Sequence, residues 1–167
     1  TLNIEDSALQ SEVNKFNTNY GNAIINVNPI VTKTSNIMEK AQKNLLSLYL
    51  INENHFSFQE LNEMIAKVHF SNKTLIIVKN TIDKLICSVN NVKALIEQLY
   101  LEFVQDEETK AIITDLICIS ETFNKLSAKD FTSIVEENIN RIENCLLEQE
   151  KAEMRSLYKN VNDNDNE

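Results

Sequence analysis

Apolar residues recur at alternating spacings of three and four through the middle third of this sequence. The series is Leu61, Met64, Val68, Ser71, Leu75, Val78, Ile82, Leu85, Val89, Val92, Ile96, Leu99 and Phe103, and only Ser71 is not apolar. A heptad seam held this long predicts one continuous helix over about residues 57–105. Ile65, Ile86 and Tyr100 widen the seam on one flank. A stripe wider than a strict seam favours a multi-helix bundle over an isolated two-stranded coiled coil.

A weaker series with the same period runs through the first segment of the chain. Pro29 lies near its middle, where it removes one backbone donor and disfavours helix at the preceding Asn28. The heptad phase is nevertheless unchanged across the proline. We therefore predict one long, kinked helix over residues 6–51, capped by Asp6 or Ser7. Two helices broken at Asn28 are the alternative.

A helix start signal separates these two segments. In the stretch NENHFSFQEL, Ser57 is a predicted N-cap and Glu60 follows three residues later, which is the capping-box arrangement. Phe56 before the cap and Leu61 after it have the spacing of a hydrophobic staple. A connection this short joins antiparallel neighbours. The signal therefore predicts a reversal of the chain between the first and second helices.

The third segment starts at a predicted N-cap, Asp106, which is followed by two glutamates where the helix dipole favours negative charge. Its seam reaches Leu126, but the next strong apolar residue, Phe131, is five positions further on. Ser127 begins a second candidate cap at this slip. We predict a helix over about 107–158 that is broken or stuttered near Ser127.

Together these segments predict an all-α fold, an elongated antiparallel bundle of three long helices. The whole chain contains one Gly and one Pro, so it lacks the turn residues that hairpins need. Asparagine is frequent, and as a poor helix former it argues mildly against long helices. We expect a single helical domain over 1–158 and a disordered acidic tail over 159–167.

The net charge of −9 is distributed unevenly. Residues 1–105 carry 9 Lys/Arg and 10 Asp/Glu, whereas residues 106–167 carry 7 and 15. Without a strongly basic face, nucleic acid is a poor candidate partner. The acidic last third either meets a basic protein surface or is simply a solvated helix face.

Three widely separated cysteines, Cys87, Cys118 and Cys145, have apolar neighbours and form no CxxC pair. This pattern suggests buried thiols in a reducing compartment, so we expect a cytoplasmic protein. No run of apolar residues is long enough for a membrane span, and we expect no membrane insertion. The sequence begins with Thr1 rather than Met, which leaves open whether a leader or upstream region was removed.

Candidate chemistry is sparse. The two histidines, His55 and His69, have no Cys or carboxylate at metal-ligand spacing, and no HExxH or ExxH motif occurs. No base marks any cysteine as a nucleophile, and one glycine cannot build a phosphate-binding loop. Asn72-Lys73-Thr74 matches the N-glycosylation sequon. It falls inside the predicted second helix, so we interpret the match as a chance occurrence. We therefore expect no catalytic, cofactor-binding or metal site and a protein that is not an enzyme.

Surplus apolar residues provide the main functional indication. Ile76, Ile77, Leu95 and Leu101 lie outside the second seam, and a thin rod has little interior to bury them. We interpret them as a candidate interaction surface for another protein chain, through helix–helix packing or as a homodimer. Burial of the same residues by the third segment is the alternative.

These patterns predict a non-enzymatic interaction or scaffolding module, a coiled-coil-like rod in a larger assembly. The first alternative is a secreted or surface-exposed helical domain that binds a host receptor or another extracellular protein. A membrane-remodelling dimer would need a basic concave face, and a helical-bundle enzyme would need a metal or cofactor. No motif selects a partner or a biological process.

Overall fold

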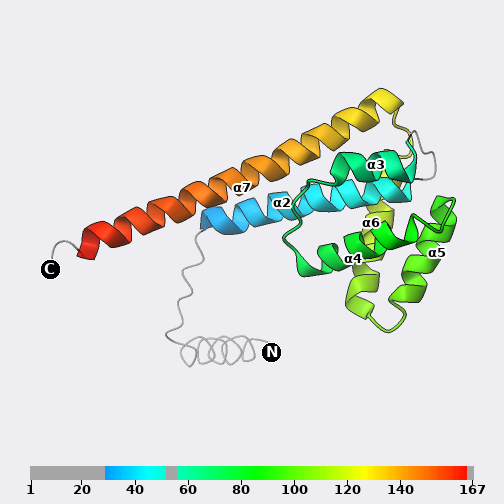
Figure 1. Ribbon diagram of the computed structural model, residues 1–167, viewed down its shortest axis with the longest axis horizontal. Helices are drawn as coiled ribbons and strands as arrows, with labels where there is room; N and C mark the ends of the chain where they lie inside the picture. The colour runs from blue at the N-terminus through cyan, green and yellow to red at the C-terminus, as the bar shows by residue number, and fades with distance from the viewer. Residues whose placement is uncertain (1–28, 52–55, 165–167) are drawn as a thin grey trace, which may run out of the picture.

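The structure of the protein, a computed structural model, describes residues 29–51 and 56–164, and this part of the chain is all-helical (Figure 1). It contains six α-helices and one 3₁₀ turn. In chain order the elements are α2 (Pro29–Ser47), η1 (Leu48–Leu50), α3 (Phe58–Ile65), α4 (Lys73–Leu85), α5 (Val92–Glu102), α6 (Glu107–Phe123) and α7 (Ala128–Asn164). The all-α prediction is therefore confirmed for the described residues.

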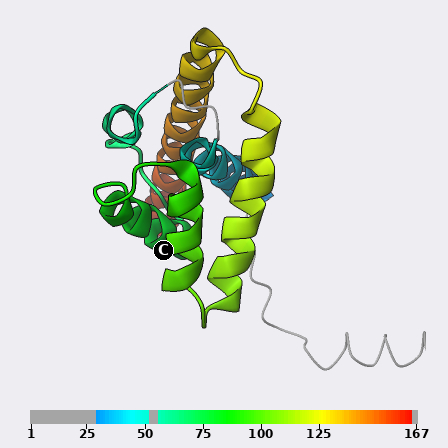
Figure 2. The ribbon, with the colours of Figure 1, turned by 90° about the vertical axis from the view of Figure 1, so that its right-hand side faces the viewer.

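Helix α2 is central to this arrangement. It runs antiparallel to the long helix α7 (Figure 1) and also packs against α6 and α4. Figure 2 shows α5 and α6 side by side at the end of the molecule that faces away from the free end of α7. The core includes a run of deeply buried large side chains around η1. Each is at most 2% exposed: Leu45, Leu46, Leu48, Tyr49 and Ile51. Burial of these large side chains is the main favourable term for the fold.

The prediction of one helix over 57–105 is wrong. The structure divides this segment into α3, α4 and α5. Asn72 accepts hydrogen bonds from the backbone N–H groups of Thr74 and Leu75 and so caps α4, while Asn91 accepts one from Ala94 and caps α5. An asparagine oxygen satisfies backbone donors that a continuous helix would pair internally, and it therefore stabilises a new helix start. The sequon at Asn72 lies at this start and not inside a helix.

Three helix starts are confirmed at the predicted residues. Ser57 and Glu60 form a reciprocal capping box at α3, and Asp106 accepts from Thr109 at the start of α6. The third segment is broken near Ser127, as predicted. There the Ser127 hydroxyl accepts from the Asp130 backbone N–H at 3.3 Å, and the Asp130 carboxylate accepts from the Ser127 hydroxyl at 2.6 Å.

The first and last helices have other ends in the structure than the sequence predicted, and part of each predicted segment lies outside the described residues. Helix α2 begins at Pro29, the position in a helix where the missing N–H of proline costs least. The predicted helical stretch 6–28 lies outside the described residues, as does its cap. Helix α7 continues past the predicted end at residue 158 as far as Asn164. Residues 165–167 of the predicted tail also lie outside the described residues.

Acidic pH should remove the charge contribution of the α6 cap. The pKa of Asp106 is lowered because the Thr109 hydroxyl and then its backbone N–H donate hydrogen bonds to the carboxylate, at 2.6 and 3.0 Å. A depressed folded-state pKa stabilises the fold above the unfolded pKa of about 3.9, and this stabilisation is lost as the pH falls through the folded value. We therefore expect wild type to be more stable than Asp106→Asn at pH 7, with the difference shrinking below about pH 4. Urea unfolding of both proteins across this pH range measures the difference in stability. A difference that does not change with pH would contradict a charge contribution from the Asp106 cap.

Candidate functional site

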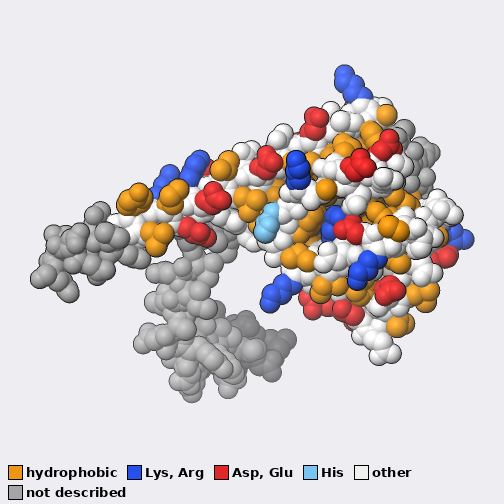
Figure 3. All heavy atoms as spheres, in the orientation of Figure 1, with side chains coloured by type: hydrophobic (Ala, Val, Ile, Leu, Met, Phe, Trp, Pro, Cys, Tyr) orange, Lys and Arg blue, Asp and Glu red, His pale blue; other side chains and the backbone are white. Residues whose placement is uncertain are grey.

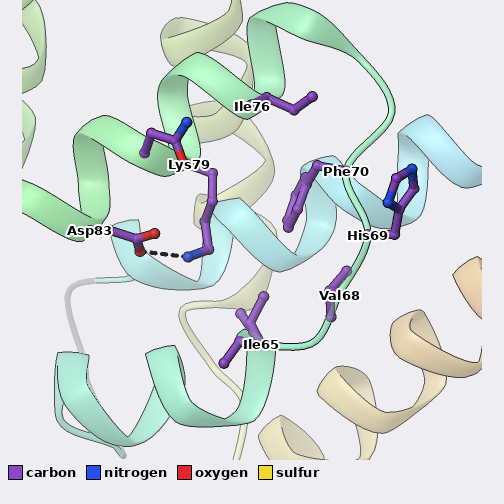
Figure 4. Close-up of a pocket in the computed structure, with 9 residues that line it drawn as sticks. Ile65, Val68, His69, Phe70, Ile76, Lys79 and Asp83 are labelled. Atoms are coloured by element: carbon purple, nitrogen blue, oxygen red, sulfur yellow. Dashed lines mark hydrogen bonds and ion pairs between the residues drawn. The ribbon is translucent and has the colours of Figure 1, made fainter.

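A hollow of about 300 Å³ opens between the end of α3, the following loop and α4 (Figure 4). All three segments contribute apolar side chains to its wall, which is of mixed character, and most of its polar groups gather on the α4 side. The lining residues are Ile65, Ala66, Val68, His69, Phe70, Ile76, Lys79, Asn80 and Asp83. In Figure 4 His69 lies at the opposite end of this group from Lys79 and Asp83.

A polar network closes the hollow on the α4 side. The Lys79 ammonium donates to Asp83 Oδ1 at 2.5 Å, one helical turn further along α4, and to Asn62 Oδ1 of α3 at 3.1 Å. The hydroxyl of Tyr49 donates to the same Asn62 oxygen at 3.0 Å. Lys79 is only 9% exposed, and a buried ammonium needs such partners to offset the loss of water. The network therefore joins η1, α3 and α4.

Tyr49 acts in this network as a neutral donor. Burial raises the pKa of Tyr49 above its ordinary value, and the nearby negative charge of Asp83 acts in the same direction. The hydroxyl therefore stays protonated at neutral pH and keeps its hydrogen bond to Asn62. Since Lys79 and Asp83 pair with one another, the arrangement offers a small recess of mixed polar and apolar lining beside an ion pair.

The residues predicted as an interaction surface do not form one surface. Ile76 is partly buried and lines the hollow, whereas its neighbour Ile77 is 48% exposed and Leu101 on α5 is 64% exposed. Leu95 is fully buried in the core. The prediction is therefore wrong for Leu95, because the breaks before α4 and α5 let the chain fold back over residues that a straight rod would leave exposed.

All three cysteines are free thiols. The expectation of burial is wrong for Cys87 and Cys118, which are both exposed. Cys145 is buried on α7, and burial raises the pKa of its thiol. A raised pKa makes this thiol a weaker nucleophile, as expected for a core cysteine. His69 is exposed, and His55 lies outside the described residues.

A group of exposed large apolar side chains lies on α7. Its free end projects past α2 (Figure 1) and carries hydrophobic and charged side chains side by side (Figure 3). Leu147, Met154, Leu157 and Tyr158 are 50%, 55%, 65% and 70% exposed. Sequence reasoning missed these residues because it followed the seam only as far as Leu146. The recurrence of large apolar residues after Leu146, off the line of the seam, was the sequence signal that could have located them.

The exposed residues of α7 face away from the bundle. The buried seam of the helix consists of Phe131, Val135, Asn138, Ile142 and Cys145. Asn138 lies against α2, since its side-chain oxygen accepts a hydrogen bond from the Asn44 amide at 3.1 Å. At about 100° per residue, Leu147, Met154 and Tyr158 lie nearly opposite that seam. We call these three residues, together with Lys151 between them, the outward stripe.

Charged residues alternate along the same stretch. Lys151 donates to Glu148 at 2.9 Å, and this hydrogen bond together with the positive charges of Lys151 and Arg155 lowers the pKa of Glu148. Glu148 is therefore ionised at neutral pH. The outward stripe thus consists of large apolar side chains flanked by fixed charges of both signs.

No protein-family model matches the sequence, and neither curated proteins nor solved structures show a similar chain. Within residues 29–51 and 56–164, no three His, Cys, Asp or Glu side chains are grouped in a way that could hold a metal ion. None of the described helices combines the length and apolar content that crossing a membrane requires.

Proposed function

We propose that the protein is a non-enzymatic helical interaction module that docks another protein chain on the outward stripe of α7. The observation that carries this proposal is the exposure of three large apolar side chains, Leu147, Met154 and Tyr158, on one face of a projecting helix. Exposed apolar surface is costly in water, and large apolar side chains that recur on one helix face are characteristic of interaction sites. A partner helix or groove that covers the stripe would remove this cost.

The bundle would hold the projecting helix in a fixed direction. The seam of α7 packs along α2, and the Asn44–Asn138 hydrogen bond fixes the register of the two helices. Lys43 of α2 also forms an ion pair with Asp115 of α6 at 2.9 Å. Helix α7 has 37 residues, which corresponds to about 55 Å at 1.5 Å per residue. Such a helix suits a scaffold role, because it presents a binding face at a set distance from the bundle.

The proposal keeps the cytoplasmic location expected from the sequence. Two of the three free thiols, Cys87 and Cys118, are exposed. Exposed unpaired cysteines are usual in a reducing compartment and are uncommon in secreted domains.

Co-purification tests the proposed docking face. The tagged protein, stabilised by mild crosslinking in cells that express it naturally, would be compared with a Leu147→Glu, Met154→Glu double variant. We expect the double variant to lose the proteins recovered with wild type, because two charges on an apolar contact must be desolvated on binding. Both positions are at least half exposed, so the fold should tolerate the substitutions.

A matched control places the same charges on a different exposed apolar pair. The Ile77→Glu, Leu101→Glu double variant alters side chains that are 48% and 64% exposed on α4 and α5. We expect this variant to retain the recovered proteins. Equal recovery by both variants, or loss through the α4 and α5 pair alone, would overturn the assignment of the docking face to α7.

A further inference from the structure

We propose that the chain docked on the outward stripe is a second copy of this protein, paired antiparallel along α7. This inference rests on the proposed docking function and adds the partner and the register. Three observations support it: the direction in which the stripe faces, the spacing of its apolar residues, and the order of charges beside it. The first observation comes from the packing of α7 on α2, and the other two come from the residues of α7 between Leu147 and Tyr158.

The direction of the stripe argues against a partner that packs beside α2. Helix α2 packs on the seam side of α7, as the Asn44–Asn138 contact shows. A partner that packed beside α2 on that side would leave the outward stripe uncovered. The outward stripe lies nearly opposite, at about 100° per residue. Covering it therefore requires a helix that approaches from outside the bundle.

The stripe can pair with itself. Leu147, Lys151, Met154 and Tyr158 follow one another at spacings of four, three and four, which is a heptad seam. When two copies run antiparallel about an axis between residues 152 and 153, Leu147 lies opposite Tyr158 of the second copy and Lys151 opposite Met154. The arrangement is two-fold symmetric, so each contact occurs twice. The aliphatic stem of Lys151 covers Met154 while its ammonium reaches solvent.

The flanking charges favour this register. With that axis, Glu148 lies beside Arg155 of the second copy, and the symmetric pair repeats the contact. Glu148 is ionised at neutral pH because Lys151 and Arg155 lower its pKa. A register centred on residue 151 would instead place Lys151 directly against Lys151 of the second copy. Like charges directly opposed are unfavourable, so the charge order selects the first register.

The interface is short, and association should depend on concentration. Residues 147–158 span about 17 Å of helix, which is at the lower end of the lengths that form specific interfaces. We expect dissociation in the micromolar range, and the mass measured by sedimentation equilibrium should rise from that of the 19.2 kDa chain toward twice that value. The Met154→Glu variant should weaken association by about 100-fold, because Met154 lies in both central layers.

A charge-swap cycle tests the register. Glu148→Arg should weaken association about 10-fold, since it replaces two attractive contacts with two repulsive ones. Combining it with Arg155→Glu should restore most of the affinity, because the antiparallel register pairs these two positions. The control swap, Glu137→Arg with Arg141→Glu, exchanges an exposed ion pair on the part of α7 packed in the bundle and should leave association unchanged.

The outcomes separate this inference from the proposed function. Wild-type protein that remains monomeric up to about 1 mM would overturn the self-association proposal. Loss of affinity that the double swap fails to restore would overturn the antiparallel register. In either case, if the Leu147→Glu, Met154→Glu variant still loses a different co-purified protein, the docking function survives. If nothing depends on these residues in either experiment, both proposals fail.

Discussion

Replacing Leu45 with alanine should lower the free energy of unfolding by about 3 kcal/mol. Leu45 lies on α2, which packs against α4, α6 and α7, and its side chain is fully buried. Truncation removes apolar contact area and leaves a cavity that close-packed neighbours fill only in part. Urea denaturation monitored by circular dichroism measures the change, provided the slope of the transition stays constant.

The matched control is the same substitution at an exposed leucine. Leu157 on α7 is 65% exposed, so Leu157→Ala should change the free energy of unfolding by no more than about 0.5 kcal/mol. Measurements at protein concentrations well below those at which copies associate keep binding out of the comparison. Similar effects of the two substitutions would show that the core does not lie around α2.

Replacing Asn62 with leucine should destabilise the fold by about 2–3 kcal/mol. The Asn62 oxygen accepts from two donors at once, the Tyr49 hydroxyl at 3.0 Å and the Lys79 ammonium at 3.1 Å. Both donors are buried. Without this acceptor the Tyr49 hydroxyl has no hydrogen-bond partner, and the Lys79 ammonium keeps only one of its two partners. The free-energy cost of burying these polar groups is then no longer offset. Urea unfolding again gives the magnitude.

A double-mutant cycle with Tyr49→Phe isolates the cause. Phenylalanine keeps the ring that fills the core but removes the hydroxyl that Asn62→Leu leaves unpaired. The double variant should therefore be less destabilised than the sum of the two single variants. Strict additivity would mean that the Tyr49–Asn62 hydrogen bond does not contribute to the cost, and the effect of Asn62→Leu would then come from the lost Lys79 contact or from packing.

Helix starts were the part of the fold most accessible from the sequence. The capping box at Ser57, the cap at Asp106 and the break near Ser127 depend on a few neighbouring residues, whose hydrogen bonds are local. Such signals do not require knowledge of distant contacts. The structure accordingly has all three at the predicted residues.

Helix continuity was not accessible from the apolar pattern. Leu75, Ile82 and Leu99 belong to the predicted seam and are fully buried, yet they lie on two helices rather than one. A heptad pattern indicates which residues are buried but not whether they lie on one helix. A chain that folds back can bury the same residues on several shorter helices. The deciding signals were Asn72 and Asn91, since an asparagine in a long apolar pattern favours a cap over a helix interior.

The two candidate sites differ in the same way. The network of Tyr49, Asn62 and Lys79 joins η1, α3 and α4, so it depends on tertiary contacts that no local pattern contains. The outward stripe was accessible in principle, because Leu147, Met154 and Tyr158 occupy one face of α7 and fall outside its seam. The surface predicted from Ile76, Ile77, Leu95 and Leu101 assumed a straight second helix, and it lost Leu95 when that helix proved to be three.

The central claim, that the outward stripe contacts another protein chain, is tested most directly by site-specific photo-crosslinking. Benzoylphenylalanine would replace Met154 in the stripe or, as a control, Lys129, which is exposed at the start of the same helix. We expect irradiation to yield a defined crosslinked species from position 154 and none from position 129. No product from position 154, or equal products from both positions, would contradict the claim.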